Sequence, residues 1–345
     1  MRRLALTALL CAAWAMAPAA GSAAAQEVTL TLHHLLSPKS LAHSQYLEPW
    51  ARRVEEQSGG RIKVEIFPSM SLGGAPPELY RQVRDGTVDM AWTVLGYTPG
   101  VFIRSEVFEL PFVHENSARA TNLAIQDLFE EYLAPDFADV KPILLHVHSG
   151  QAIHMVERPV NGIADLKGLK LRTPSRTGAW MIESWDAEPV GMPVPDLPQA
   201  LSKGVVDGAL IPYEIAMPLK VYELTNYSIE GENAVRFGTI VFMFAMNKER
   251  YASLPDDLKA VIDANAGSNI AAQVGEVWDS VEPKGRELTR GSGSEIIELD
   301  DAAMAGFRDR AGVVIDRWVE EVSGQGLDGK ALVEAARAAI ARHKN

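Results

Sequence analysis

The stretch "LKGLKLRTPSRTGAW", Leu166 to Trp180, contains a strand that ends where a helix should begin. Leucines alternate with basic residues as far as Thr173, which is the period-two pattern of a strand with one buried face. Pro174 ends the strand because it has no N–H for the hydrogen-bond ladder. Arg172 thus lies at the carboxyl end of a strand, where open α/β sheets bind ligands. Its planar guanidinium matches a carboxylate; a surface ion pair on an edge strand is the alternative interpretation.

The segments around this stretch predict two similar α/β lobes. Strands and helices alternate in each, which is typical of mostly parallel sheets. The two lobes share the sequence G-x-V-D in "QVRDGTVDMAW" and "ALSKGVVDGAL", so that Asp89 and Asp207 occupy equivalent points. The predicted strands and helices are 28–34, about 41–58, 61–67, 77–86 and 88–94 in the first lobe, and 168–174, 177–185, 187–193, 195–204 and 205–212 in the second.

The later part of the chain is expected to connect the lobes. The strand-like "IVFMFAMNK" returns the chain to the first lobe, and apolar residues at helical spacing after Pro255 predict a long helix that braces both lobes. Residues 301–345 are predicted to be helical. We therefore predict an α/β two-lobed fold with mostly parallel sheets and crossing hinge strands. The first lobe comprises residues 26–148 plus about 239–275, and the second 149–238 plus about 276–345 with the connecting helix.

The first residues have the features of a cleavable signal peptide, residues 1–25. Arg2 and Arg3 precede an apolar run that is too short to span a bilayer comfortably, and Ala23 and Ala25 form an A-x-A cleavage pattern. We expect export and cleavage after Ala25; a retained membrane anchor is the alternative. Cys11 is the sole cysteine and lies in this segment, so the mature chain has no disulfide and no cysteine metal site.

Charge and motifs exclude several classes of function. The formal net charge of -12 argues against a nucleic-acid partner, which requires a basic face. No hydrolase, zinc-protease or nucleotide-binding motif is present, so neither an enzyme nor a cofactor is predicted; a secreted hydrolase with a triad formed only in space is the alternative. His146 and His148 share a strand face but have no acidic neighbour in sequence, and we predict no metal site.

Aromatic residues at strand ends are candidates for contact with a ligand. Such ends border the binding crevice of open α/β sheets, although ordinary core packing is the alternative for each. Trp185 comes late in its predicted helix and is expected in the core. The aromatic residues at or just beyond strand ends are Trp92, Tyr97, Trp180, Trp185 and Tyr213.

Several segments in order resemble a known family. "DLKGLKLRTPSRTGAWMIESWDAEPVGMPVPDLPQALSKGVVDGALIP" resembles the core signature of the substrate-binding proteins of TRAP transporters, the DctP family, in which D-L-K-G-x-K-x-R-x-P is followed by V-D-G-x-x-x-P. "SGGRIKVEIFPSMSLGG", "DGTVDMAW", "FELPF" and "MNKERYASLPDDLKAVI" also resemble family segments. Each motif is modest alone, but the ordered set covers nearly the whole mature chain.

The resemblance implies a two-lobed periplasmic-binding-protein fold that closes over an organic acid. The protein would be periplasmic, a monomer, and would deliver the acid to membrane permease subunits. The arginine that grips the ligand carboxylate in the family falls on Arg172, followed by Pro174. A sensor that presents the acid to a receptor is an alternative within this resemblance. We further expect Trp92, Trp180, Tyr213 and His33 at the ligand.

Three departures from the family's sugar-acid binders predict the class of ligand. Ile211 stands where those proteins have a polar asparagine, Val94 replaces a pocket glutamate, and Gln151 takes the place of a second arginine. Each change removes a polar partner, and an unpaired polar group costs about 1–3 kcal/mol. The resemblance therefore favours a monocarboxylate with an apolar or aromatic body. A C4-dicarboxylate is the alternative ligand.

Overall fold

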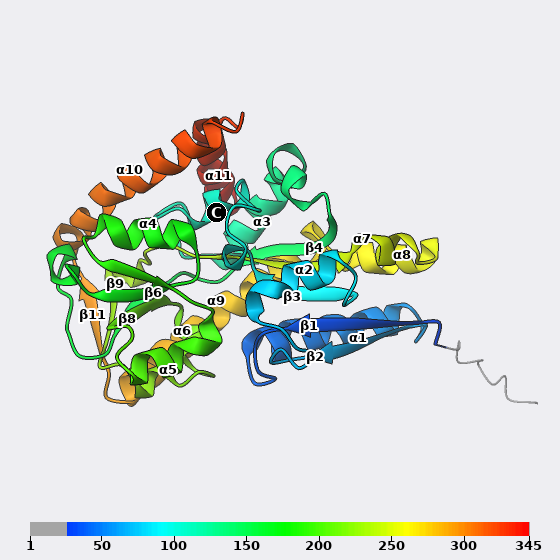
Figure 1. The fold of residues 1–345 in the computed structure, drawn as a ribbon, viewed down its shortest axis with the longest axis horizontal. Helices are drawn as coiled ribbons and strands as arrows, with labels where there is room; N and C mark the ends of the chain where they lie inside the picture. Colours follow the sequence, from blue (N-terminus) through cyan, green and yellow to red (C-terminus); the bar gives the residue numbers. More distant parts are fainter. Residues whose placement is uncertain (1–25, 345) are drawn as a thin grey trace, which may run out of the picture.

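The computed structural model describes residues 26–344 and shows two α/β lobes (Figure 1). The predicted signal peptide, residues 1–25, lies outside the described residues. Each lobe is built on one mixed sheet covered by helices, in agreement with the predicted α/β two-lobed fold. The first sheet has the strand order β2-β1-β3-β10-β4 and the second β11-β9-β5-β8-β6-β7.

The first lobe contains the segments expected from the sequence and, in addition, elements such as α3 (Ala118–Leu128) that the sequence did not predict. The strands are β1 (Val28–His34), β2 (Ile62–Phe67), β3 (Met90–Val94), β4 (Val140–Val147) and β10 (Val241–Asn247). The helices are α1 (Glu48–Gln57), α2 (Leu79–Arg84), α3 (Ala118–Leu128), α7 (Lys248–Ala252) and α8 (Asp256–Ala264). A π-helical turn, Ala42–Leu47, precedes α1.

The second lobe contains the remaining strands and four helices along its faces. The strands are β5 (Ala152–Met155), β6 (Lys170–Thr173), β7 (Glu188–Gly191), β8 (Gly208–Ile211), β9 (Tyr227–Gly231) and β11 (Glu295–Leu299). The helices are α4 (Arg176–Ser184), α5 (Leu197–Ser202), α6 (Tyr213–Ala216) and α10 (Asp301–Ser323). Two further helices, α9 (Ser268–Gly291) and α11 (Gly329–His343), link or cover the lobes.

The two sheets repeat one pattern, as the shared G-x-V-D predicted. In the first lobe β2, β1 and β3 run parallel and β10 joins antiparallel; in the second, β7, β6 and β8 run parallel and β5 joins antiparallel. The Asp89 carboxylate accepts a hydrogen bond from the Thr31 N–H, 2.8 Å away. Asp207 does the same with the Lys170 N–H of the equivalent strand, also at 2.8 Å. By this equivalence, β6 corresponds to β1.

Three connections join the lobes. The chain crosses from β4 to β5 and returns from β9 to β10, and α9 then runs diagonally from the first lobe to the second (Figure 1). Two glycines in α9 let this helix pack closely against both lobes. A Cβ on Gly275 would lie 2.3 Å from the Arg119 Cα in α3, and one on Gly285 would lie 2.7 Å from the Tyr213 Cβ in α6. Helix α9 thus braces both lobes as predicted.

The helical pattern after Pro255 forms two helices instead of one. Gly267 has φ +54, a conformation that favours glycine, and separates α8 from α9. Hydrophobic spacing continues across this break, so it could not locate the end of α8. No helix among residues 26–344 is both long and apolar enough to cross a membrane.

The end of the chain differs from the predicted lobe division. Helix α10 packs against α4 of the second lobe, but α11 packs against α3 of the first. His343 Nε2 lies 2.8 Å from an Asp127 carboxylate oxygen, and Lys344 is 2.6 Å from Glu115. The turn between α10 and α11 contains Gly326 at φ +82. Helical periodicity shows which face is apolar but not which lobe covers it.

Candidate functional site

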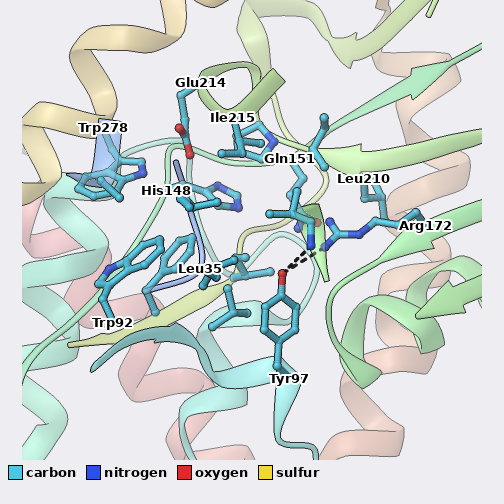
Figure 2. Close-up of a pocket in the computed structure, with 18 residues that line it drawn as sticks. Leu35, Trp92, Tyr97, His148, Gln151, Arg172, Leu210, Glu214, Ile215 and Trp278 are labelled. Atoms are coloured by element: carbon cyan, nitrogen blue, oxygen red, sulfur yellow. Dashed lines mark hydrogen bonds between the residues drawn. The ribbon is translucent and has the colours of Figure 1, made fainter. Parts of the chain in front are cut away.

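Residues of both lobes line a pocket between them (Figure 2). It lies at the ends of β3, β6 and β8, where the sequence predicted the ligand crevice. Five predicted site residues meet there: Trp92, Val94, Gln151, Arg172 and Ile211. The other lining residues are Leu35, Leu36, Ala42, Tyr97, His148, Val194, Leu210, Pro212, Glu214, Ile215, Ile240, Phe242 and Trp278.

Arg172 is a buried cation without an ion-pair partner among residues 26–344. Its residue is 2% exposed. Nε and one terminal nitrogen, Nη2, donate to the Met192 carbonyl at 3.0 and 2.8 Å, and Nη2 lies 3.5 Å from the Tyr97 hydroxyl. Burial lowers the guanidinium pKa, and Tyr97 opposes that shift. A buried charge is costly without a counter-charge, so this end of the pocket favours an anion.

Two polar side chains accompany Arg172 at this end. The Tyr97 hydroxyl accepts a hydrogen bond from the Val194 N–H at 2.8 Å, which fixes its oxygen beside the guanidinium (Figure 2). Gln151 is held by its backbone, with its N–H donating to the Gly238 carbonyl at 2.7 Å. Its side-chain amide has no hydrogen bond within the described residues and lines the pocket. The amide is therefore free to bind a ligand oxygen.

A stacked aromatic pair forms one wall. The rings of Trp92 and Phe242 are 4.8 Å apart with an interplanar angle of 12°. The Trp92 Nε1–H donates to His146 Nε2 at 2.9 Å, which holds the indole in this orientation. Burial lowers the pKa of His146 to about 3, so this acceptor nitrogen stays unprotonated. His146, a metal candidate in the sequence, here positions an aromatic surface.

The opposite end of the pocket is polar but not cationic. Glu214, in α6, and Trp278, in α9, lie together on the side away from Arg172 (Figure 2). Burial, followed by repulsion from Glu282, raises the pKa of Glu214 to about 8, while the Trp278 N–H lowers it slightly. The Glu214 carboxyl is therefore largely neutral at pH 7. It does not repel an anionic ligand.

Four predicted site residues do not line this pocket. Trp180 packs beneath the Arg176 and Arg317 guanidinium groups, 5.0 and 4.3 Å from its ring centre. Tyr213 packs against His154, with 5.0 Å between ring centroids. The Pro174 carbonyl faces the opposite lobe at Gly96.

His33 also faces away from the pocket, where its Nδ1 lies 2.8 Å from the Gln82 side chain. Burial is the main cause that lowers its pKa. It lies in β1 at the position equivalent to Arg172 in β6, but Leu35 and Leu36, just beyond the end of β1, are the residues that reach the pocket. No group of three or more His, Cys, Asp or Glu side chains in residues 26–344 is placed to hold a metal ion.

Sequence reasoning missed several pocket residues. Tyr97 is an aromatic residue beyond a strand end and His148 has the spacing of a metal ligand, but neither pattern assigns the residue to the ligand. Glu214 had a signal, since it follows directly on β8 and Pro212. Trp278 had none, because its spacing in α9 matches that of ordinary core residues.

The lobes also touch through residues that do not line the pocket. The Glu109 carboxylate accepts from the Thr177 hydroxyl at 2.9 Å, and Glu106 pairs with Arg176 at 2.5 and 2.6 Å. A Cβ on Gly96 would lie only 2.6 Å from the Ser175 Cβ. Because each of these contacts joins the first lobe to the second, the described structure is a closed arrangement.

Glu214 should give the folded protein a measurable pH dependence. A carboxyl whose pKa is raised by folding contributes stability that is present below its unfolded pKa, about 4.5, and lost as pH rises through about 8. We expect Glu214→Gln to remove this loss. Between pH 5 and 8, the free energy of unfolding of the variant should therefore rise relative to that of the wild type by up to about 1.4 kcal/mol per pH unit. Denaturant unfolding at several pH values measures this difference.

The exposed Glu334, on α11, provides the matched control. Glu334→Gln should follow the wild-type profile. Parallel profiles for Glu214→Gln and the wild type would show that Glu214 is ionised throughout this range.

Comparison with known proteins identifies the family. Residues 32–321 match the model of the bacterial extracellular solute-binding protein family 7, DctP. A TRAP solute-binding protein of an unidentified marine microbe, described as specific for aromatic acids and solved with 3-hydroxybenzoate, is 40% identical with a TM-score of 0.90. The match covers 93% of this chain and 100% of that one.

Two other solved structures are similar over most of their length. A TRAP solute-binding protein from Rhodoferax ferrireducens with copurified benzoate is 39% identical, covering 92% of this chain and 98% of that one, with a TM-score of 0.89. One from Bordetella bronchiseptica with bound (R)- and (S)-mandelate is 26% identical, covering 91% and 99%, with a TM-score of 0.84. The chain belongs to the bacterial extracellular solute-binding protein family 7, and is a substrate-binding protein of the TRAP-transporter type.

Proposed function

We propose that this protein captures an aromatic monocarboxylic acid by closing its two lobes and delivers it to a membrane permease. The observation that carries the proposal is the buried, unpaired guanidinium of Arg172, which opens into a largely apolar pocket. The ligand carboxylate binds to Arg172 and to the Gln151 amide. Its ring packs against the stacked Trp92 and Phe242.

The lining residues disfavour the other acids considered. A dicarboxylate needs a second cation, but Arg172 is the sole Arg or Lys among the residues that line the pocket, and the far end holds Glu214. A sugar acid needs many hydrogen-bond partners, whereas Val94 and Ile211 offer none. Leaving a buried polar group unpaired costs about 1–3 kcal/mol. The three similar structures reported above, with 3-hydroxybenzoate, benzoate and mandelate bound, support an aromatic body.

We infer the cellular location and the membrane partners of this protein from its family. Its members are extracytoplasmic receptors for small organic acids and work with membrane permease components. For this chain we propose export through a signal peptide cleaved after Ala25, and action in the periplasm as a monomer. Capture requires no covalent chemistry, since affinity arises from contacts that are made only when the lobes close.

A ligand panel tests the class of acid. Benzoate, phenylacetate and mandelate should raise the melting temperature of the mature protein, because a ligand at a hundred times its Kd adds about 2.7 kcal/mol. Succinate and glucuronate, each carrying the same carboxylate, are the controls and should give no shift. Thermal unfolding followed by calorimetric titration measures both effects. Shifts with succinate or glucuronate alone would contradict an aromatic ligand.

Replacing Arg172 should weaken ligand binding without lowering the stability of the unliganded protein. Arg172→Met removes the group that pairs the carboxylate, so benzoate binding should weaken by about 2–5 kcal/mol. The unliganded protein should be as stable as the wild type or more so, because a buried unpaired charge is removed. Titration calorimetry and denaturant unfolding measure the two quantities.

Arg104, paired with Asp136 away from the pocket, is the matched control. Arg104→Met leaves the buried Asp136 without its partner, so stability should fall while benzoate affinity stays the same. If Arg172→Met instead lowers stability and binds benzoate normally, Arg172 is a structural residue.

A methyl group at Gly96 should hinder closure. Gly96→Ala places a Cβ against Ser175 in the closed form only, and overpacking of this kind costs about 1–3 kcal/mol. We expect benzoate affinity to fall about 5- to 150-fold without loss of unliganded stability. Gly312, on the exposed side of α10 with open space at its Cβ position, is the control. Wild-type affinity in Gly96→Ala would show that binding does not need this contact.

A further inference from the structure

We infer that the end of the pocket formed by Glu214 and Trp278 binds a hydroxyl group carried on the ligand ring, remote from the carboxylate. The inference rests on the proposed function and adds the substituent that the protein selects. It comes from polar groups on the pocket wall that make no well-formed hydrogen bond within residues 26–344.

Trp278 supplies a fixed donor at this end. The residue is 1% exposed, and its Nε1 makes no hydrogen bond of regular geometry within the described residues, although it approaches the Glu214 carboxyl. Its ring is held between His146, at 4.6 Å between centroids, and Tyr46, at 5.9 Å. The indole therefore cannot turn its N–H to another acceptor without disrupting this packing. Buried tryptophan N–H groups usually have a well-formed partner, so a ligand atom placed beside Glu214 would complete the bonding of this one.

Glu214 supplies the complementary group. It is 5% exposed, and its backbone N–H donates to Glu282 at 3.1 Å, which fixes the start of the side chain. The carboxyl forms no ion pair and no hydrogen bond of regular geometry within the described residues. In Figure 2 its oxygens lie on the same side of the pocket as the Trp278 nitrogen. A carboxyl group in this position can accept a hydrogen bond from the ligand.

His148 adds a second donor to the same pocket. Its Nδ1 accepts from the Gly150 N–H at 3.0 Å, and a backbone N–H can only donate. The proton of the neutral ring is therefore on Nε2, which is buried and has no partner within residues 26–344. Burial keeps the ring neutral, because it lowers the pKa of His148 well below its usual value.

A hydroxyl matches these groups better than other ring substituents. It has two lone pairs for the Trp278 and His148 N–H groups and one proton for the Glu214 carboxyl. A methyl or hydrogen leaves the His148 N–H unpaired, and an ammonium has no lone pair to offer either N–H group. A second carboxylate meets the Glu214 acid without any cation. Sites that hydrogen-bond a ligand hydroxyl discriminate strongly against the analogue that lacks it.

The placement also restricts where the hydroxyl is attached. Arg172 and Tyr97 lie at one side of the pocket, and Glu214 and Trp278 at the other (Figure 2). A hydroxyl next to the carboxylate, as in 2-hydroxybenzoate, stays beside Arg172 and cannot reach the far groups. A hydroxyl at the 3- or 4-position extends away from the carboxylate and can do so.

The experiment compares benzoate with its three hydroxylated isomers by calorimetric titration of the wild-type protein. We expect the 3- or the 4-isomer to bind at least about tenfold more tightly than benzoate, which is ~1.4 kcal/mol, and the 2-isomer to gain nothing. Trp278→Phe and Glu214→Leu should each reduce this ratio toward one. Trp50→Phe, at a buried tryptophan bonded to the Asn265 carbonyl outside the pocket, should keep it.

The outcomes separate this inference from the proposed function. Benzoate binding without preference for any hydroxylated isomer would overturn the inference and leave the proposed function standing. An equal gain for the 2-isomer, or a ratio that survives both pocket substitutions, would overturn it too, because the hydroxyl would then be bound elsewhere. A wild-type protein that binds none of the four acids would overturn both.

Discussion

The structure depends on one buried positive charge that residues 26–344 leave without an ion-pair partner. Arg172 is held by the Met192 carbonyl and the Tyr97 hydroxyl. These partners are neutral and do not offset the free energy that it costs to bury a guanidinium. A ligand carboxylate supplies the missing charge, so closure and binding stabilise each other. Because the pocket is otherwise largely apolar, its ligand selectivity depends on the carboxylate and on the apolar group that carries the carboxylate.

The duplicated architecture places this charge opposite an aromatic wall. Arg172 belongs to the second lobe, whereas Trp92 and Phe242 belong to the first, so neither lobe contains the whole site. Close contact at Gly96 lets the lobes meet, and the glycines of α9 let one helix contact both. The packing that defines the fold therefore also sets the dimensions of the pocket.

The errors in the predicted site have a common cause at strand ends. Its place just beyond a strand end makes Tyr213 a candidate for ligand contact, but α6 begins at Tyr213 and the helical turn brings Glu214 and Ile215 to the pocket instead. Trp180 lies in the second turn of α4, whereas only the first residues of this helix face the crevice. Where the period changes from two to 3.6, sequence spacing no longer defines direction.

The sequence by itself determined the order of strands and helices, the repeat marked by Asp89 and Asp207, and the position of Arg172 at a strand end. These features are local, because periodicity and proline or glycine signals act over a few residues. Only the tertiary structure decided that α11 returns to the first lobe and that Glu214 and Trp278 face the same pocket. Those relations join segments distant in sequence, and they depend on which apolar faces pack together.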